Sequence, residues 1–314
     1  MITKQLSNMD IFKGMELLEF TDKFNNDESC KAYLAHHKWS NGFICPKCGC
    51  KEHHHSKDIY VKRCKKCFNK DSVTSGTLFH KVKFPLRKAF MIVFQMSTTS
   101  KSISANQLSK SLGINPKTAW LFEQKIRIAM QSSQLLPLMG EIDVDEAFIG
   151  GKQEGHQGRG NETKSTIVFA IEKTKNDDGI KRAYAMKIDN TSSAELSKIF
   201  HQHIDPKAHI TTDKWTGYMP LVKEWDITQV KSKGGENFQL MHRLIQGVKS
   251  WIRAAAAAGI YHKVSPKYLQ AYLDEYCYGF NRNIFKDSIF DNLIQRMIRT
   301  KPMPYKSFSE AISI

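Results

Sequence analysis

Two Cys-x-x-Cys pairs constrain the fold of this chain more than any other feature. Cys45 and Cys48 are followed, after fifteen intervening residues, by Cys64 and Cys67. Each pair can present two thiolates to one tetrahedral ion, and Gly49 behind the first pair can adopt the positive φ that such a turn requires. The spacing therefore predicts a zinc ribbon in which these four cysteines bind a structural Zn²⁺.

The other cysteines and the histidine run suggest different roles. Cys30 and Cys277 lie in helical patterns and are expected to be small core residues. Cys50 can in principle exchange with Cys48 as a ligand, whereas the three adjacent histidines 53–55 cannot all point toward one ion and are expected to be solvated. An odd number of cysteines in a chain without a secretory signal argues against disulfides and predicts a cytoplasmic protein.

The charge of the chain indicates the kind of partner. The 314 residues carry 47 Lys and Arg against 31 Asp and Glu, and residues 45–140 hold 17 of the basic side chains but 4 of the acidic ones. Such a surface attracts polyanions through counterion release, so we expect a nucleic acid. No run approaches the roughly 18 apolar residues that a membrane span needs, so no membrane partner is expected.

Residues 102–130 have the form of a helix-turn-helix. The pattern predicts one helix from Ala105 to Leu112, a turn at Gly113, and a second helix that begins at Pro116. Basic side chains flank the apolar stripe of the second helix and are candidate DNA-binding residues: Lys117, Lys125 and Arg127.

The pattern changes to strands after the loop at residues 134–140. Strand-like runs at 141–151, 165–173, 181–189 and 208–215, with a helix at 191–204, predict an α/β domain. Glu141, Asp143 and Asp145 alternate along the first strand and therefore face one side, and Asp213 closes the last. Carboxylates at the ends of adjacent strands suit a two-Mg²⁺ phosphoryl-transfer site, although turn or cap roles stay open from the spacing alone.

The order of the motifs points to a family. CPKCG, RCKKC, SVTSGTLFH, ISANQLSKSLGINPKTAW, DVDEAFIGGK, TTDKWTGY, MHRLIQGVKSW, VSPKYLQAYLDEY and FNRN follow one another along the chain. Over about residues 40–282 the sequence resembles the ISXO-like insertion-sequence transposases. The resemblance implies an α/β, RNase H-like mixed sheet with flanking helices, preceded by a zinc ribbon and a helical helix-turn-helix segment.

The expected division of the chain follows from the residue patterns together with this resemblance. We expect an N-terminal helical segment at 1–40, the zinc ribbon at 41–80, and a helix-turn-helix-like helical DNA-binding region at 81–138. The RNase H-like catalytic domain is expected at 139–300 and a C-terminal tail at 301–314.

The same resemblance implies a DNA transposase of the DDE type. It would bind double-stranded DNA at the terminal inverted repeats, cleave a strand with Mg²⁺, and join it to target DNA. Because both ends must be held together, a homo-oligomer of at least two chains is expected in the cytoplasm, on the nucleoid.

The resemblance also assigns the site residues. Asp145 and Asp213 become the first two catalytic carboxylates and the Mg²⁺ ligands. The third position falls seven residues before a Lys, and Lys249 fits that Lys, which places His242 where many relatives carry Glu or Asn. Glu236 is the rival third acid.

Two departures from the family pattern bear on activity. The alanines at 254–258 are inserted where the family passes almost directly into a Gly-Ile-Tyr-His-like stretch, and Gly279 stands where the family tends to carry Arg. Either change can leave an inactive copy. The alternative functions are therefore a zinc-ribbon DNA-binding regulator with an inactive RNase H-like domain, and a nuclease that cuts without joining.

Overall fold

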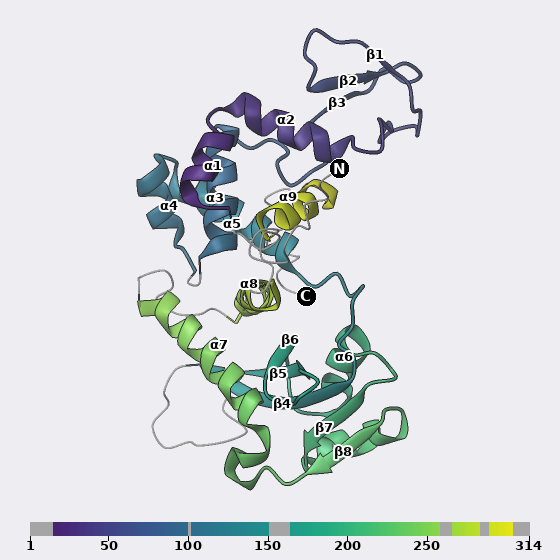
Figure 1. The fold of residues 1–314 in the computed structure, drawn as a ribbon, viewed down its shortest axis with the longest axis vertical. Coiled ribbons are helices and arrows are strands. Elements are labelled where there is room, and N and C mark those ends of the chain that lie inside the picture. Colours follow the sequence, from purple (N-terminus) through teal and green to yellow (C-terminus); the bar gives the residue numbers. More distant parts are fainter. Residues whose placement is uncertain (1–14, 100–101, 151–163, 258–265, 283–288, 304–314) are drawn as a thin grey trace, which may run out of the picture. The chain divides into compact units, whose positions relative to one another are not determined.

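A computed structural model describes residues 15–99, 102–150, 164–257, 266–282 and 289–303 of the chain (Figure 1). It divides into two compact units, one formed by residues 1–130 and 282–314 and the other by residues 131–281. Each unit is described by itself below. Within the described ranges, no helix combines the length and apolar character needed to cross a membrane.

Helices around an aromatic core form most of the first unit. They are α1 (Leu17–Lys23), α2 (Asp27–Lys38), α3 (Leu86–Thr98), α4 (Ala105–Leu112), α5 (Pro116–Met130) and α9 (Ile289–Arg299). Phe20 of α1 and Phe24 at its C-terminal end pack on Phe94 and Phe90 of α3. The ring centroid of Phe290 lies within 6.2 Å of the ring centroids of all four. Aromatic pairs at these distances stabilise a core beyond the area that they bury.

Helix α9 belongs to this first unit, although the sequence-based boundaries assigned residues 139–300 to the catalytic domain. Its apolar face is buried, and the amide of Leu78 donates a hydrogen bond to the carbonyl of Met297 at 3.0 Å. An amphipathic pattern shows that a helix covers something but not what it covers, so the sequence could not place α9. Of the expected tail, residues 304–314 lie outside the described residues.

The ribbon is a three-stranded antiparallel sheet in the order β1-β2-β3. Its strands are β1 (His53–His54), β2 (Val61–Cys64) and β3 (Lys70–Ser72). Cys64 is buried on one face, and on that face Lys62 lies 4.3 Å from the centroid of the Trp39 ring. This face is therefore the one that packs on the rest of the unit.

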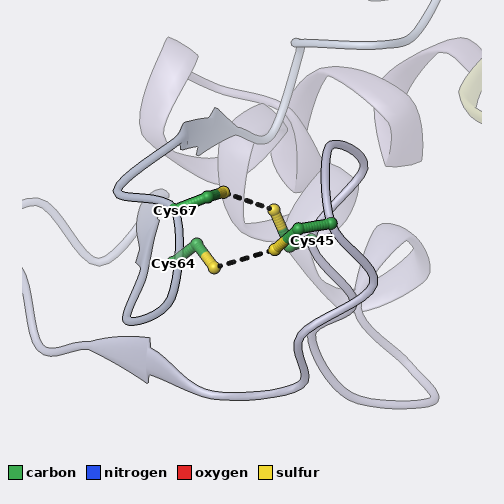
Figure 2. A group of neighbouring side chains, drawn as sticks. Cys45, Cys64 and Cys67 are labelled. Carbon is green, nitrogen blue, oxygen red and sulfur yellow. Dashed lines mark hydrogen bonds between the residues drawn. The ribbon is translucent and has the colours of Figure 1, made fainter.

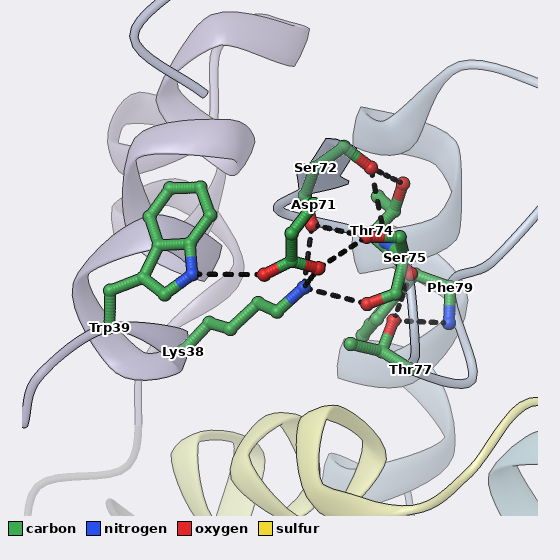
Figure 3. Close-up of polar contacts among 8 residues, drawn as sticks. All are labelled: Lys38, Trp39, Asp71, Ser72, Thr74, Ser75, Thr77 and Phe79. Atoms are coloured by element: carbon green, nitrogen blue, oxygen red, sulfur yellow. Dashed lines mark hydrogen bonds and ion pairs between the residues drawn. The ribbon is translucent and has the colours of Figure 1, made fainter. Parts of the chain in front are cut away.

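A buried ion pair joins α2 to the end of the ribbon (Figure 3). Lys38 Nζ donates to Asp71 Oδ1 at 2.7 Å and to the carbonyls of Ser72 and Ser75 at 2.6 and 2.7 Å. Asp71 also accepts from Ser75 Oγ at 2.6 Å and from Trp39 Nε1 at 3.3 Å. All three ammonium protons and both carboxylate oxygens thus have partners, which is the condition under which a buried pair is tolerated.

The helix-turn-helix forms as the sequence predicts. Ser104 caps α4, and Gly113 ends it with a φ of +58°, a backbone conformation that side chains rarely adopt. Helix α5 begins at Pro116, and its apolar stripe is buried: Ala119, Phe122, Ile126 and Ala129.

A five-stranded mixed sheet in the order β6-β5-β4-β7-β8 forms the centre of the second unit. The strands are β4 (Glu141–Gly150), β5 (Lys164–Lys173), β6 (Ile180–Ile188), β7 (His209–Asp213) and β8 (Ile227–Val230). Neighbours β4, β5 and β6 pair antiparallel, whereas β7 pairs parallel with both β4 and β8. Strand β8 was not predicted, because a run of four residues at a sheet edge, three half-buried and one exposed, is too short to show a clear alternation.

Helices cover both faces of this sheet. Helix α6 (Ser193–His203) and the 3-10 helix η2 (Thr216–Lys223) pack on one face. The 3-10 helix η3 (Lys233–Phe238), α7 (Gln239–Ala257) and α8 (Leu269–Arg282) pack on the other. The predicted α/β fold with a mixed sheet and flanking helices is confirmed.

Candidate active site and metal centre

Asp145 and Asp213 occupy equivalent positions on two neighbouring strands. The parallel register of β4 and β7 pairs Val144 with Thr212, and the next residue on each strand is the aspartate. Neighbouring strands lie about 4.8 Å apart, and residues at the same level of a parallel pair face the same side. The sheet therefore presents both carboxylates together, on the face that α7 covers.

Local hydrogen bonds hold each carboxylate. Asp145 Oδ1 accepts the backbone N–H of Glu146, and Asp213 Oδ1 accepts that of Trp215, both at 2.9 Å. The turn after Asp213 is fixed in addition, because Trp215 Nε1 donates to the Thr191 carbonyl at 3.0 Å and Gln229 Nε2 to the Asp213 carbonyl at 3.1 Å. Such bracing limits the movement of a ligand before a metal arrives.

Helix α7 places His242 beside the Asp145 carboxylate. His242 Nε2 lies 3.6 Å from Asp145 Oδ2, with side chains that are 43% and 16% exposed. The helix packs on the sheet through a row of buried side chains: Met241, Leu244, Ile245, Val248 and Ile252. Leu240 and Trp251 lie at the edge of this row and are half-buried.

Lys249 is close enough to Asp145 for the two charges to interact. It follows His242 by two helical turns and so lies on the same side of α7. Burial lowers the pKa of Lys249, the charges of Arg253 and Lys164 lower it further, and the charge of Asp145 opposes them. The structure thus brings Asp145, His242 and Lys249 together, and adds two cations that the sequence did not indicate.

Glu146 and Tyr218 form a hydrogen-bonded pair that sequence reasoning missed. Tyr218 is fully buried, and its hydroxyl donates to Glu146 Oε2 at 2.9 Å. Burial raises the pKa of Tyr218 well above its ordinary value, and the charges of Glu146, Asp145 and Asp213 add to this effect. The sequence signal that could have indicated this pair is the alternation of side chains along a strand. Because Glu146 directly follows Asp145, its side chain points to the opposite, apolar face of the sheet, where a carboxylate needs a hydrogen-bond donor.

The other acidic candidates have different surroundings. Glu236 is exposed in η3 and Glu141 is exposed at the start of β4. Asp143 is buried and pairs with Lys173 Nζ at 3.3 Å, so its carboxylate has a structural partner. Sequence alternation placed Asp143 and Asp145 on one side correctly, but it could not show that a lysine neutralises Asp143.

The two departures from the family pattern are only partly visible. Helix α7 continues through Ala257, so it includes four of the five inserted alanines, and residue 258 lies outside the described residues. Gly279 lies in α8, where a Cβ atom would meet no heavy atom within 4 Å. The position that carries no Arg here therefore has space for a side chain.

Four cysteine sulfurs converge in the ribbon (Figure 2). The sulfurs of Cys45 and Cys67 lie 3.5 Å apart, those of Cys48 and Cys64 lie 3.6 Å apart, and all four fall within 4.8 Å of one another. Zn–S bonds of about 2.3 Å in a tetrahedron imply sulfur separations of about 3.8 Å. These residues therefore fit a closed, structural Zn²⁺ site.

The surroundings of the sulfurs agree with this fit. The N–H groups of Cys67 and then Lys66 point at the Cys64 sulfur and lower its pKa, which favours the thiolate that a metal requires. Cys50 instead contacts Glu52 and is outside the group, and His54 and His55 are exposed. Among the described residues, these four cysteines alone bring three or more candidate ligand atoms so close together.

The predicted DNA-binding residues of α5 separate into two classes. Lys117 is exposed at the start of the helix. Lys125 is 8% exposed and contacts the His80 carbonyl, and Arg127 is 1% exposed and pairs with Glu123 at 3.5 Å. A buried side chain cannot reach a phosphate, so the burial of Lys125 and Arg127 does not fit the predicted DNA-binding role.

Comparisons with known proteins match both units. Residues 137–281 match the family described as the ISXO2-like transposase domain, and residues 25–70 match the transposase zinc-ribbon domain. A relative from Halobacterium salinarum, named as an uncharacterized protein in transposable element ISH50, is 22% identical over 211 residues. That match covers 63% of this chain and 71% of the relative. The first family match contains both aspartates and His242, and the second contains the four cysteines.

Proposed function

Because the chain belongs to the ISXO2-like transposase family, with its zinc ribbon and its RNase H-like DDE-type domain, we propose that it is an active DNA transposase. It binds the terminal inverted repeats of an insertion sequence, cleaves a strand at the element's end, and transfers the freed 3′-hydroxyl to target DNA. The observation that carries this proposal is the equivalent position of Asp145 and Asp213 on adjacent parallel strands.

The donor set fits catalytic Mg²⁺. Asp145 and Asp213 offer hard carboxylate oxygens on one face of the sheet, and Mg²⁺ is bound in proteins through one or two carboxylates plus water and substrate phosphate. Bound Mg²⁺ would neutralise charge on the scissile phosphate and activate the attacking oxygen. The protein's part is to hold both aspartates by the backbone N–H groups of Glu146 and Trp215.

We assign the third position to His242 rather than to Glu236. His242 contacts Asp145, whereas Glu236 is exposed in η3. A neutral imidazole nitrogen can complete a metal site or contact the phosphate. Lys249, on the same side of α7, then binds a phosphate as a point charge.

The first unit would bind the DNA ends. Its zinc ribbon and helix-turn-helix lie within the most basic part of the sequence, and Lys117 is exposed where the second helix begins. The Zn²⁺ is structural, because all four tetrahedral positions are taken by cysteine. Two ends must be held together during joining, so we propose an assembly of at least two chains on DNA.

The test is a cleavage and strand-transfer assay with full-length protein and a labelled duplex that carries the element's end. Asp145→Asn and Asp213→Asn should abolish both steps in Mg²⁺ and in Mn²⁺ while each variant still binds the duplex. Asp226→Asn is the matched control, because Asp226 contacts His209 at the opposite end of β7 and is 73% exposed. Normal cleavage by Asp145→Asn contradicts the assignment.

The same assay separates the alternative functions. Binding without cleavage by the unmodified protein identifies a zinc-ribbon regulator, and cleavage without joining identifies a nuclease. Among the residues that the structure describes, no contact favours either over the transposase.

A further inference from the structure

The ribbon sheet has one covered face and one exposed face. On the covered face lie Cys64, Lys62 over Trp39, and Asp71, which pairs with Lys38. The strand register places His54 opposite Arg63, and Arg63 opposite Lys70, across all three strands. These three side chains are exposed, so a row of nitrogen-bearing groups crosses the other face.

Phe68 lies beside this row in an unusual backbone conformation. The two cysteine turns are alike, since the N–H of Gly49 bonds the Cys45 carbonyl and the N–H of Phe68 bonds the Cys64 carbonyl. Gly49 has a φ of +72°, and Phe68 adopts a φ of +60° at the corresponding position. A side chain is strained in this region, where glycine is the ordinary residue.

Packing does not explain why a phenylalanine occupies this strained position. The Phe68 side chain is 56% exposed, so the core gains little from it. Its ring instead has the Arg63 guanidinium 5.2 Å from its centroid and the His54 ring stacked at 6.0 Å and 11°. An observed backbone outlier without a packing reason points to function.

The charge of the ribbon favours an anionic partner. Residues 45–70 contain eight Lys and Arg side chains but two acidic ones, Glu52 and Asp58. Glu52 is already paired with Lys65 at 3.2 Å. A Zn²⁺ with four thiolates contributes a charge of −2, which leaves the ribbon clearly positive.

Resting on the proposed function, we infer that His54, Arg63, Phe68 and Lys70, the ribbon outer face, form the surface by which the zinc ribbon contacts duplex DNA at the element's end. Arg63 and Lys70 neutralise phosphates. The uncharged ring of Phe68 packs on deoxyribose or inserts at a base step, as apolar wedges in DNA-binding proteins do.

The test compares full-length variants in binding to a duplex that carries the element's end, at several salt concentrations. Phe68→Gly removes the ring and restores the residue that this φ favours. It should keep its zinc and its melting temperature, and raise the Kd about tenfold without changing the slope of log K against log salt. Arg63→Ala should lower that slope by about one, since one phosphate contact is lost. Ile59→Ala, which removes another exposed apolar side chain of the ribbon, is the matched control and should bind normally.

Three results would overturn the inference, and they are distinguishable. If the unmodified protein does not bind the duplex, the proposed end binding fails together with this surface. If the unmodified protein binds and Phe68→Gly binds equally well, the proposed function stands and this surface is wrong. If Phe68→Gly loses zinc or melts earlier, the ring has a structural role instead.

Discussion

His242 Nε2 lies 3.6 Å from Asp145 Oδ2, so a side chain of α7 contacts the Asp145 carboxylate of β4. Lys249 lies on the same side of the helix, and its charge also interacts with the Asp145 carboxylate. The helix thus contributes an imidazole and an ammonium group where a purely acidic site would have a third carboxylate.

This contact leads to a prediction for the third catalytic position. His242→Ala should reduce cleavage of a labelled DNA end about 100-fold or more, whereas His242→Glu should retain part of the activity in Mg²⁺, since a carboxylate is the harder ligand. His209→Ala is the control, because His209 begins β7 at the end of the strand away from Asp213. Equal activity of His242→Ala and the unmodified protein contradicts the prediction.

The stability of the second unit should depend on pH through His203. This residue is 8% exposed and stacks on Tyr184 at 4.3 Å, and burial lowers its pKa from 6.5 to about 4. Between these values the unfolded chain binds a proton that the folded chain does not, so stability falls as the pH falls. The loss from this residue amounts to about 3 kcal/mol.

Replacement by a ring without a titratable group tests this prediction. His203→Phe should show a smaller decrease in the free energy of unfolding between pH 6.5 and 4 than the unmodified protein, as measured by urea denaturation. His201→Phe on the same helix is exposed and should leave the pH dependence unchanged. Parallel pH profiles for His203→Phe and the unmodified protein would show that His203 does not titrate as described.

The buried pair between Lys38 and Asp71 should be costly to break from one side. Lys38→Met leaves a carboxylate buried without its cation and should destabilise the first unit by about 3–5 kcal/mol. Lys31→Met is the control, because Lys31 and Glu28 are exposed partners 3.5 Å apart and such pairs contribute about 0–1 kcal/mol. Thermal unfolding by circular dichroism measures both variants, and equal shifts would contradict the prediction.

Zinc binding should distinguish the cysteines of the ribbon. A Cys64→Ser, Cys67→Ser double variant should lose the metal and unfold the ribbon, since metal binding and folding are coupled in such sites. Cys50→Ser should keep one Zn²⁺ per chain, because Cys50 lies outside the four-sulfur group. Metal content by mass spectrometry and end binding by gel shift are the measurements, and zinc retained by the double variant contradicts the site.

The lysines of α5 should differ in their effect on DNA binding. Lys117→Ala should lower the slope of log K against log salt by about one if it neutralises one phosphate. Lys125→Met should leave the slope unchanged, because the Lys125 side chain is buried. Burial disfavours the charged form of Lys125 and lowers its pKa. A slope changed equally by both substitutions would show that burial does not separate them.

Local features of the fold could be predicted from the sequence. Gly113 and Pro116 mark the turn between α4 and α5, and the cysteine spacing marks the ribbon, because each depends on neighbours within the chain. The burial of Lys125 and Arg127 could not be predicted, since a helix pattern gives the direction of a side chain but not what covers it. Alternation along β4 could indicate that Glu146 needs a buried donor, but no local pattern identifies Tyr218, 72 positions away, as that donor.

The placement of α9 has a consequence for the synthesis of the protein. The ribbon, the helix-turn-helix and α9 share one unit, but residues 131–281 separate α5 from α9 in the chain. The second unit is thus an insertion within the first unit. A ribosome completes the second unit first, and the aromatic core around Phe90 stays open until Phe290 leaves the ribosome. A nascent chain, or one truncated before α9, therefore lacks a finished first unit.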